Sequence, residues 1–321
     1  MAVVDKPEPQ VEADQILLRL KYVGFCGSDL NTFRGGNAMV TYPRIPGHEI
    51  GAVIEKIGSS VPSGVFSLGQ TVAVNPYTNC GHCASCRNNR VNACENNETL
   101  GVQRNGAMQE YISLPWQKII PADDISPRDA ALVEPLSVGF HAVDRGMVND
   151  TDTVMVLGCG MVGLGAIIRS VHRGATVIAA DIDDEKLELA RSLGAQYTYN
   201  TLNHDNEDSL PQPSVVIEAV GSPFTYPLAV EKVAFTGRVV CIGYAKQDIS
   251  FTTRLFVQKE LDIRGSRNAT PKDFEAAIKY LRGKDNSRLI SSIVRPEESL
   301  SAMQSWDKAP GKVFRILVNF E

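Results

Sequence analysis

A glycine-rich turn between a predicted strand and a predicted helix restricts the possible folds of this chain more than any other feature. The strand is the apolar, β-branched run TVMVLG at residues 153–158, and the turn places Gly158, Gly160 and Gly163 in G-x-G-x-x-G spacing. An apolar pattern with helical period follows to about Arg173. A strand, this spacing and a helix in that order predict a dinucleotide-binding βαβ unit.

Each glycine has a physical reason to be there. Gly158 permits the tight turn, Gly160 lets the backbone approach a pyrophosphate, and Gly163 allows the helix to pack closely on the strand. The helix N-terminus favours the anion. The alternative is a glycine-rich turn with no ligand.

Cofactor choice depends on the end of the next predicted strand, TVIAAD at residues 176–181. Asp181 is placed to accept hydrogen bonds from the adenosine ribose and to repel a 2′-phosphate, so NAD is expected rather than NADP. Lys186 could reach the other ribose hydroxyls. The alternatives are a surface acid at Asp181 and a solvated helix lysine at Lys186. The remaining residues expected to line the cofactor site are Met161, Val162, Val220 and Ile242.

Strand and helix patterns alternate over residues 153–266, with further strands predicted at 197–200, 215–220, 238–243 and 261–266. The segment DDEKLELARSLGA has acidic residues at its start, Arg191 late and Gly194 at its end, which is typical of a helix. Such alternation predicts a doubly wound parallel sheet covered by helices on both faces. We assign this α/β domain to residues 137–266.

The flanking segments have a different texture, with short strands and many Gly and Pro residues. Residues 16–24 and 49–58 are predicted strands of an antiparallel or barrel-like domain. In DFEAAIKYLRG a helix is expected, with Thr270 at its N-cap and Pro271 at its first position. The final strand, within 312–320, is expected to return to the first domain. The second domain would then comprise residues 1–136 and 267–321.

Four cysteines lie within residues 79–95 with the spacing C-x2-C-x2-C-x7-C, namely Cys80, Cys83, Cys86 and Cys94. A ferredoxin-type cluster would have a final gap of about three residues followed by proline, whereas here Glu95 follows a gap of seven. Four thiolates at this spacing favour a closed, structural zinc site, which does not activate a substrate. The chemistry must therefore lie elsewhere.

Composition excludes several classes of protein. The chain has 321 residues, which suggests about two domains, and its seven cysteines are an odd number without a secretion signal, which argues against a disulfide framework. The net charge is −5 and no basic stripe is present, so a nucleic-acid partner is not expected. No apolar run is long enough to span a membrane. We expect a cytoplasmic protein with no membrane partner.

A second group of potential metal ligands lies in turn-rich segments before residue 137. GFCGSDL contains Cys26, PGHEIG contains His48 and Glu49, and VEPLSVG contains Glu134. One cysteine, one histidine and one carboxylate would give zinc three protein ligands and an open fourth position. Spacing alone leaves this open, because a lone Cys or His is more often a core residue.

Taken together, CGSD, GHE, the four-cysteine lobe, EPLSVGFHA and the G-x-G-x-x-G turn resemble the zinc-dependent medium-chain alcohol and polyol dehydrogenases. The resemblance covers nearly the whole chain and is strongest to the sorbitol, threonine and sugar-acid dehydrogenase branch. There Glu134 stands where classical alcohol dehydrogenases have a second cysteine. GSRNATPKDF closely resembles L-galactonate 5-dehydrogenase-like enzymes. The fold implied is a Rossmann domain plus a mainly β, GroES-like catalytic domain.

The resemblance implies two zinc ions per chain, one structural and one catalytic, with NAD as cofactor. Cys26, His48 and Glu134 would hold the catalytic zinc, and Glu49 could exchange into its shell. Ser28 would relay the substrate proton, and Asp29 would orient His48; a turn or capping role is the alternative for both. Many relatives have a histidine where this chain has Asn31, and an amide cannot titrate.

The implied reaction is hydride transfer from a secondary hydroxyl of a polyol or sugar acid to NAD, in a homodimer or homotetramer. Arg267 follows the last predicted strand of the nucleotide domain and could bind a substrate carboxylate through its guanidinium fork, or pair with Glu134 or a backbone carbonyl. Alternatives for the whole chain are a threonine or simple secondary alcohol dehydrogenase, an inactive NAD-binding protein, and a zinc-free reductase. The last should lack GHE and the four-cysteine lobe.

Overall fold

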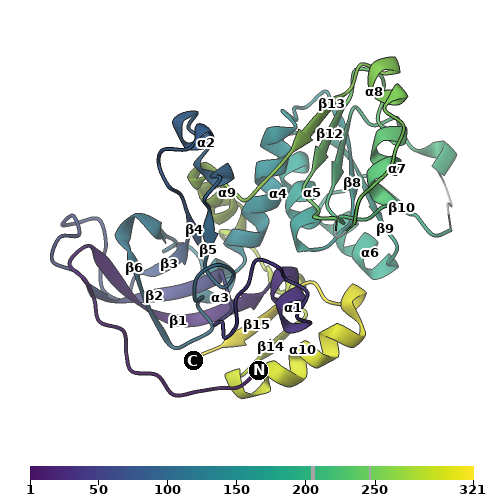
Figure 1. The fold of residues 1–321 in the computed structure, drawn as a ribbon. Helices are drawn as coiled ribbons and strands as arrows, with labels where there is room; N and C mark the ends of the chain where they lie inside the picture. The colour runs from purple at the N-terminus through teal and green to yellow at the C-terminus, as the bar shows by residue number, and fades with distance from the viewer. Residues whose placement is uncertain (204–206, 246) are drawn as a thin grey trace. The chain divides into compact units, whose positions relative to one another are not determined.

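Residues 1–203, 207–245 and 247–321 are described by a computed structural model, in which the chain forms two units. Unit 1 comprises Met1–Pro135 and Thr270–Glu321, and unit 2 comprises Leu136–Ala269. Unit 1 is thus discontinuous in sequence, and its last segment rejoins the first (Figure 1). No helix in the described ranges has the length and apolar character needed to cross a membrane.

Unit 1 is organised around the long strand β1 (Gln15–Phe25). Its antiparallel partners are β2 (Glu49–Ile57), β6 (Tyr111–Pro115) and β15 (Ile316–Asn319). Within the described residues this sheet has seven strands in the order β14-β15-β1-β2-β3-β7, with β6 also paired to β1. The outer strands are β3 (Thr71–Val74), β7 (Ile119–Pro121) and β14 (Ser292–Val294). The predicted return of the C-terminal strand is confirmed by the β1–β15 pairing.

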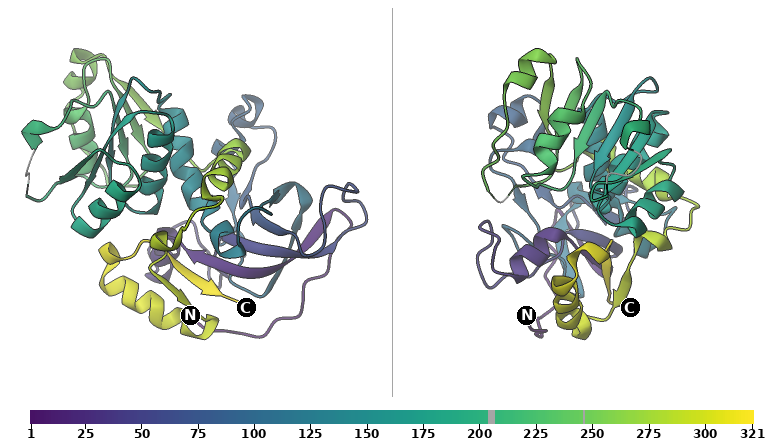
Figure 2. Two further views of the ribbon diagram at one scale, coloured as in Figure 1. Left: turned by 180° about the vertical axis from the view of Figure 1, so that it is seen from behind. Right: turned by 90° about the vertical axis from the view of Figure 1, so that its right-hand side faces the viewer.

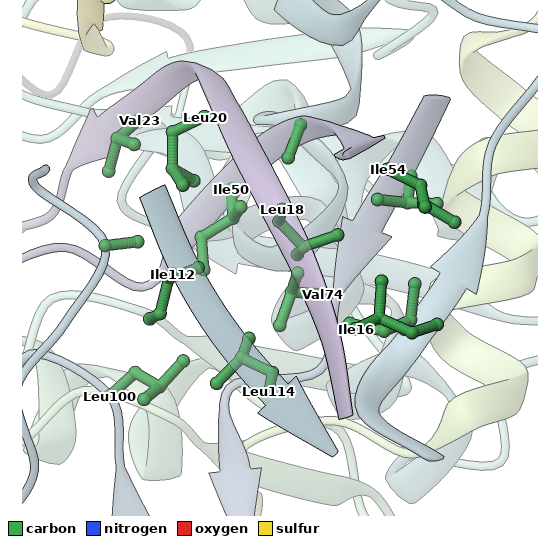
Figure 3. Close-up of a cluster of buried hydrophobic side chains, with 14 of the residues drawn as sticks. Ile16, Leu18, Leu20, Val23, Ile50, Ile54, Val74, Leu100, Ile112 and Leu114 are labelled. Atoms are coloured by element: carbon green, nitrogen blue, oxygen red, sulfur yellow. The ribbon is translucent and has the colours of Figure 1, made fainter. Parts of the chain in front are cut away.

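The core of unit 1 follows from the period-two alternation of β1. Ile16, Leu18 and Leu20 point to one face of the strand and are buried against Ile50 and Ile54 of β2 (Figure 3). The helices of this unit are α1 (Gly27–Phe33), α2 (Ala84–Arg87), α3 (Pro127–Ala130), α9 (Pro271–Leu281) and α10 (Ser299–Lys308).

A second apolar cluster anchors the end of β1. Phe25, the last residue of β1, packs with Leu30 of α1, Met303 and Trp306 of α10, and Ile316 of β15. This packing fixes the turn from β1 into α1.

Unit 2 contains a parallel sheet whose described strands number six, in the order β10-β9-β8-β11-β12-β13. The strands are β8 (Thr153–Leu157), β9 (Thr176–Asp181), β10 (Tyr197–Asn200), β11 (Val215–Glu218), β12 (Arg238–Cys241) and β13 (Asp262–Gly265). Chain order therefore reverses between β8 and β11, which is the point where doubly wound folds bind dinucleotides.

Helices cover both faces of this sheet. After β8 the chain crosses toward β9, and after β11 it crosses the other way toward β12, so right-handed crossovers place α5 and α7 on opposite faces (Figures 1 and 2). The helices are α5 (Met161–His172), α6 (Asp184–Ser192), α7 (Thr225–Lys232) and α8 (Arg254–Gln258), and α4 (Val133–Arg145) leads into the unit. The predicted fold class, a Rossmann domain plus a mainly β domain, is confirmed.

Candidate active site

A sulfur, a nitrogen and a carboxylate oxygen come together at the ends of two strands of unit 1. Cys26 follows β1 and is the N-cap residue of α1, while His48 precedes β2 and Glu49 is its first residue. Their ligand atoms all lie within 4.8 Å of one another. Gly24 faces Glu49 across the strands, and a Cβ there would lie 2.2 Å from Glu49 Oε2. The missing side chain at Gly24 therefore makes room for the carboxylate.

Several polar atoms of this cluster are buried without a hydrogen-bond partner. His48 is 5% exposed and Glu49 is 0% exposed. Among the described residues, His48 Nδ1 and Glu49 Oε1 have no hydrogen-bond partner, and Glu49 Oε2 has only an ion pair with Arg315. Buried polar groups are almost always paired, so these nitrogen and oxygen donors beside a cysteine sulfur point to a ligand. Zinc accepts these donors, and three of them would leave one position open.

The cluster is strongly coupled electrostatically. Burial opposes ionisation of the Cys26 thiol, but the hydrogen bond and charge of His48 outweigh burial and lower its pKa. Burial also opposes protonation of His48, yet Cys26, Asp29 and Glu134 together raise its pKa well above the usual value. Burial raises the pKa of Glu49 well above its ordinary range, although the Arg315 charge acts in the opposite direction.

Glu134 lies beside this cluster rather than within it. The sequence predicted Glu134 as the third ligand and Glu49 as an exchange ligand, whereas the structure groups Glu49 with Cys26 and His48. Glu134 is buried near the start of α4, and the hydroxyl of Tyr77 donates a hydrogen bond to its Oε1. Burial, then the Glu134 charge, raises the pKa of Tyr77 well above its usual value. The phenol therefore remains the donor and Glu134 the acceptor.

Helix α1 holds the predicted residues Ser28 and Asp29 close to Cys26, and also Asn31. Ser28 Oγ is buried and has no partner among the described residues, so it is available to a substrate hydroxyl. Asp29 Oδ2 accepts a hydrogen bond from the Cys26 amide at 2.8 Å, so this side chain caps the helix. The charge of Asp29 also helps to raise the pKa of His48. Asn31 is half-buried on the same helix. The roles of Ser28 and Asp29 stay predictions.

Arg315 is a member of the site that sequence reasoning missed. It precedes β15 and is 4% exposed. Its Nε lies 3.1 Å from Glu49 Oε2, and its Nη1 donates to the carbonyl oxygen of Phe25 at 2.5 Å. Arg315 therefore links the C-terminal strand to the end of β1 and balances the buried Glu49 charge. Arg315 lies far along the chain from Cys26, His48 and Glu49, and no local sequence motif marks it as part of the site.

Replacing Arg315 with methionine is expected to destabilise unit 1 of the zinc-free protein by about 3–5 kcal/mol, because the buried Glu49 carboxylate then loses its ion pair. Urea unfolding followed by tryptophan fluorescence measures this loss. Both tryptophans of the chain, Trp116 and Trp306, belong to unit 1, so the signal reports that unit.

Arg34→Met is the matched control, because Arg34 pairs with Asp307 at 2.5 Å while their side chains are 36% and 42% exposed. Surface pairs contribute at most about 1 kcal/mol. The double variant Arg315→Met/Glu49→Gln should recover part of the stability. Equal losses in the two single variants would show that the Arg315–Glu49 pair contributes no more to the free energy of unfolding than an exposed pair does.

The four predicted lobe cysteines also come together. Their sulfurs lie within 4.8 Å of one another, with Cys83 to Cys86 at 3.5 Å and Cys83 to Cys94 at 3.8 Å. Tetrahedral zinc with Zn–S bonds of about 2.3 Å would place sulfurs about 3.8 Å apart. All four are free thiols. The cluster is compatible with a structural zinc.

Local hydrogen bonds favour thiolates in part of this lobe. The pKa of Cys83 is lowered to about 5, first by the Ser85 hydroxyl and then by backbone amides. The pKa of Cys80 is lowered to about 7, mainly by a hydrogen bond from the backbone of His82. Burial raises the pKa of Cys86 to about 11. Since metal ligands must be deprotonated, the lobe is partly prepared for a cation.

The glycine-rich turn of unit 2 has the geometry that its sequence predicts. Gly158 has φ +95°, a conformation that side chains disfavour. A Cβ on Gly163 would lie 1.8 Å from the Gly158 carbonyl oxygen, whereas one on Gly160 would meet nothing within 4 Å. Gly163 is thus required for packing, and the open side of Gly160 lets a ligand approach the backbone. Met161 is buried at the start of α5, with Val162 half-buried after it.

Asp181 ends β9 beside this turn. Its Oδ2 accepts a hydrogen bond from the Cys159 amide at 2.7 Å, and its Oδ1 accepts from the Ile182 amide at 2.8 Å. The carboxylate therefore joins the glycine-rich turn to the second strand. Lys186 is half-buried in the first turn of α6.

Glu218 is a second residue that sequence reasoning missed. It ends β11 with 0% exposure, and its Oε1 accepts hydrogen bonds from the amides of Val220 and Gly221 at 2.9 and 2.7 Å. The carbonyl oxygen of Glu218 accepts a hydrogen bond from the Ile242 amide at 2.9 Å. Val220 in turn crowds Gly158, since a Cβ there would lie 2.6 Å from Val220 Cγ2. Glu218 therefore links the turns that follow β8, β11 and β12.

Arg267 lies two residues after β13, is half-buried and belongs to unit 2 by the division of the chain. The sequence boundary had placed it at the start of the second part of the catalytic domain. Its role toward a substrate carboxylate stays a prediction.

Comparison with known proteins agrees with the two-unit architecture. The family profile of the alcohol dehydrogenase GroES-like domain matches residues 12–124, and that of the zinc-binding dehydrogenases matches residues 162–282. The L-galactonate-5-dehydrogenase of Escherichia coli is 35% identical over 81% of this chain and 78% of its own length. The sorbitol dehydrogenase of Bacillus subtilis is 31% identical over 97% of this chain and 92% of its own.

Solved structures agree as well. An Escherichia coli alcohol dehydrogenase in complex with NADH is 28% identical with a TM-score of 0.89, covering 99% of this chain and 96% of that one. A zinc-binding dehydrogenase of Sinorhizobium meliloti bound to NADP is 26% identical with a TM-score of 0.89, covering 97% and 93%. The chain therefore belongs to the zinc-binding, medium-chain alcohol dehydrogenase family.

Proposed function

We propose that this protein is a zinc- and NAD-dependent dehydrogenase that oxidises a secondary hydroxyl of a polyol or a sugar acid. The main support is the buried cluster of Cys26, His48 and Glu49, in which His48 Nδ1 and Glu49 Oε1 lack hydrogen-bond partners among the described residues. The relatives named for L-galactonate and sorbitol support the substrate class.

In the proposed site, Cys26, His48 and Glu49 hold the catalytic zinc, and Glu134 stands beside it. Bound zinc supplies a Lewis acid that favours the deprotonated form of a hydroxyl. Ser28 Oγ, buried next to Cys26, accepts the proton of the substrate hydroxyl and passes it outward. NAD bound in unit 2 would supply the nicotinamide that takes the hydride from the substrate carbon, which would convert the alcohol into a ketone and NAD into NADH.

Unit 2 holds the cofactor in this proposal. The Gly158–Gly163 turn and the start of α5 bind the pyrophosphate, and the Asp181 carboxylate accepts hydrogen bonds from the ribose hydroxyls. A 2′-phosphate would bring negative charge against Asp181, a contact that costs several kcal/mol in other interfaces. NAD is therefore proposed over NADP, and the homodimer or homotetramer typical of the family is expected.

The test is a substrate panel: NAD reduction with sorbitol, L-galactonate, L-idonate, L-threonine and simple alcohols, repeated with NADP. We expect turnover on a polyol or sugar acid, and activity with NADP lower by about 10-fold or more. Activity confined to unfunctionalised primary alcohols would contradict the substrate class. No turnover on any substrate by a protein that binds NADH would favour the inactive NAD-binding protein.

A further inference from the structure

Tyr77 connects the four-cysteine lobe to the candidate zinc centre. It is the first residue of β4 (Tyr77–Thr78), which pairs antiparallel with β5 (Glu98–Thr99) so that Tyr77 lies opposite Thr99. The lobe cysteines, from Cys80 to Cys94, all fall in the loop that this pair of strands closes. The position of Tyr77 is thus set by the base of the lobe.

Both the ring and the backbone of Tyr77 have fixed partners. Tyr77 is 6% exposed, and its ring packs edge-on against that of Phe274, with 6.3 Å between the ring centroids and 71° between the ring planes. Its backbone amide donates a hydrogen bond to Asn75 Oδ1 at 3.1 Å. Its carbonyl oxygen accepts from Lys118 Nζ at 2.6 Å. Burial, the Phe274 contact and the backbone hydrogen bonds together restrict the ring and therefore the position of its hydroxyl.

That hydroxyl donates to Oε1 of Glu134, which is itself only 5% exposed. A buried carboxylate needs a donor, and the donor's position determines how the carboxylate is turned. Residues outside the ligand set orient the groups around the metal in other zinc sites.

We propose that Tyr77 is a positioning residue that fixes the orientation of the Glu134 carboxylate beside the catalytic zinc. The inference rests on the proposed function, because it needs zinc at Cys26, His48 and Glu49. It adds a residue to the site and connects the two zinc positions of unit 1 through a few residues of chain.

The test is Tyr77→Phe, which removes the hydroxyl and keeps the ring. Zinc release to a chromogenic chelator is followed over time in the purified protein. One of the two zinc ions per chain should bind about 10-fold more weakly and leave correspondingly faster, as when other residues outside the ligand set of a zinc site are changed. The lobe zinc should be unaffected.

Tyr199→Phe is the matched control. Tyr199 is 1% exposed and its hydroxyl donates to Glu207 Oε2 at 2.7 Å, in unit 2. Tyr199→Phe also loses a tyrosine–glutamate hydrogen bond, but it lies outside both metal-ligand clusters. Both zinc ions should therefore be released at the rates seen in the parent protein. A general loss of stability would appear in both variants, whereas faster release of one zinc would appear only in Tyr77→Phe.

A double variant sharpens the test. Once Glu134→Gln has changed the carboxylate, adding Tyr77→Phe should alter zinc release less than twofold. Unchanged release in Tyr77→Phe, faster release of both ions, or full additivity with Glu134→Gln would each overturn the inference. A parent protein that holds one zinc per chain would instead overturn the proposed function, and the inference with it.

Discussion

Cys26→Ser is expected to remove the catalytic zinc and lower kcat/KM by about 1,000-fold or more. Cys26 supplies the sulfur of the three-atom cluster, and its lowered pKa favours the thiolate against the cost of burial. Lewis-acid stabilisation by a metal is worth several kcal/mol, and each 1.36 kcal/mol corresponds to tenfold in rate. Steady-state kinetics and zinc content per chain are the measurements, with content falling from two ions to one.

Cys241→Ser serves as the control for zinc content, since Cys241 is half-buried in β12 of unit 2 and belongs to neither cluster. It should retain both ions. Parental turnover and two zinc ions in Cys26→Ser would contradict the assignment of the site.

Cys94→Ser is expected to lower stability first and activity only as a consequence. Cys94 is 0% exposed, and its sulfur accepts the Cys80 amide at 3.3 Å while lying 3.8 Å from Cys83 Sγ. Loss of a structural metal is among the few causes of destabilisation above about 4 kcal/mol. For a unit of this size, that corresponds to about 10 °C in Tm.

Thermal unfolding with tryptophan detection checks this prediction, because it reports unit 1. Stripping zinc from the parent protein with a strong chelator should reproduce the lower Tm, and the chelator should have little further effect on Cys94→Ser. A variant that loses activity while keeping its Tm and both zinc ions would show that the lobe is not primarily structural.

Features of the nucleotide unit that depend on neighbouring residues could be predicted from the sequence. The predicted strands at 153–158 and 176–181 correspond to β8 and β9, and Gly158 has the positive φ that its turn demands. Thr270 and Pro271 begin α9 as expected, with Asp273 accepting the Thr270 amide at 2.8 Å. Turn chemistry, capping and strand period act over a few residues, so the local sequence contains them.

Contacts between distant segments could not be predicted in the same way. The sequence offered two carboxylates, and only the register of β1 with β2 shows that Glu49 lies with Cys26 and His48. Arg315 reaches Glu49 from the far end of the chain, and Tyr77 reaches Glu134 from the base of the lobe. No local pattern marks these partners, because each depends on how remote strands pair.

By itself, the sequence determined the chemical inventory of this protein: the glycine turn, four closely spaced thiols and the soft and carboxylate donors of a second metal site. These are set by residue type and short spacing. Only the tertiary structure decided which donors meet, which lack partners and which are held by Arg315 or Tyr77. The physical reason is that a buried polar group must be paired by whatever the fold brings to it, and the pairing of β1 with β2 and β15 makes that choice.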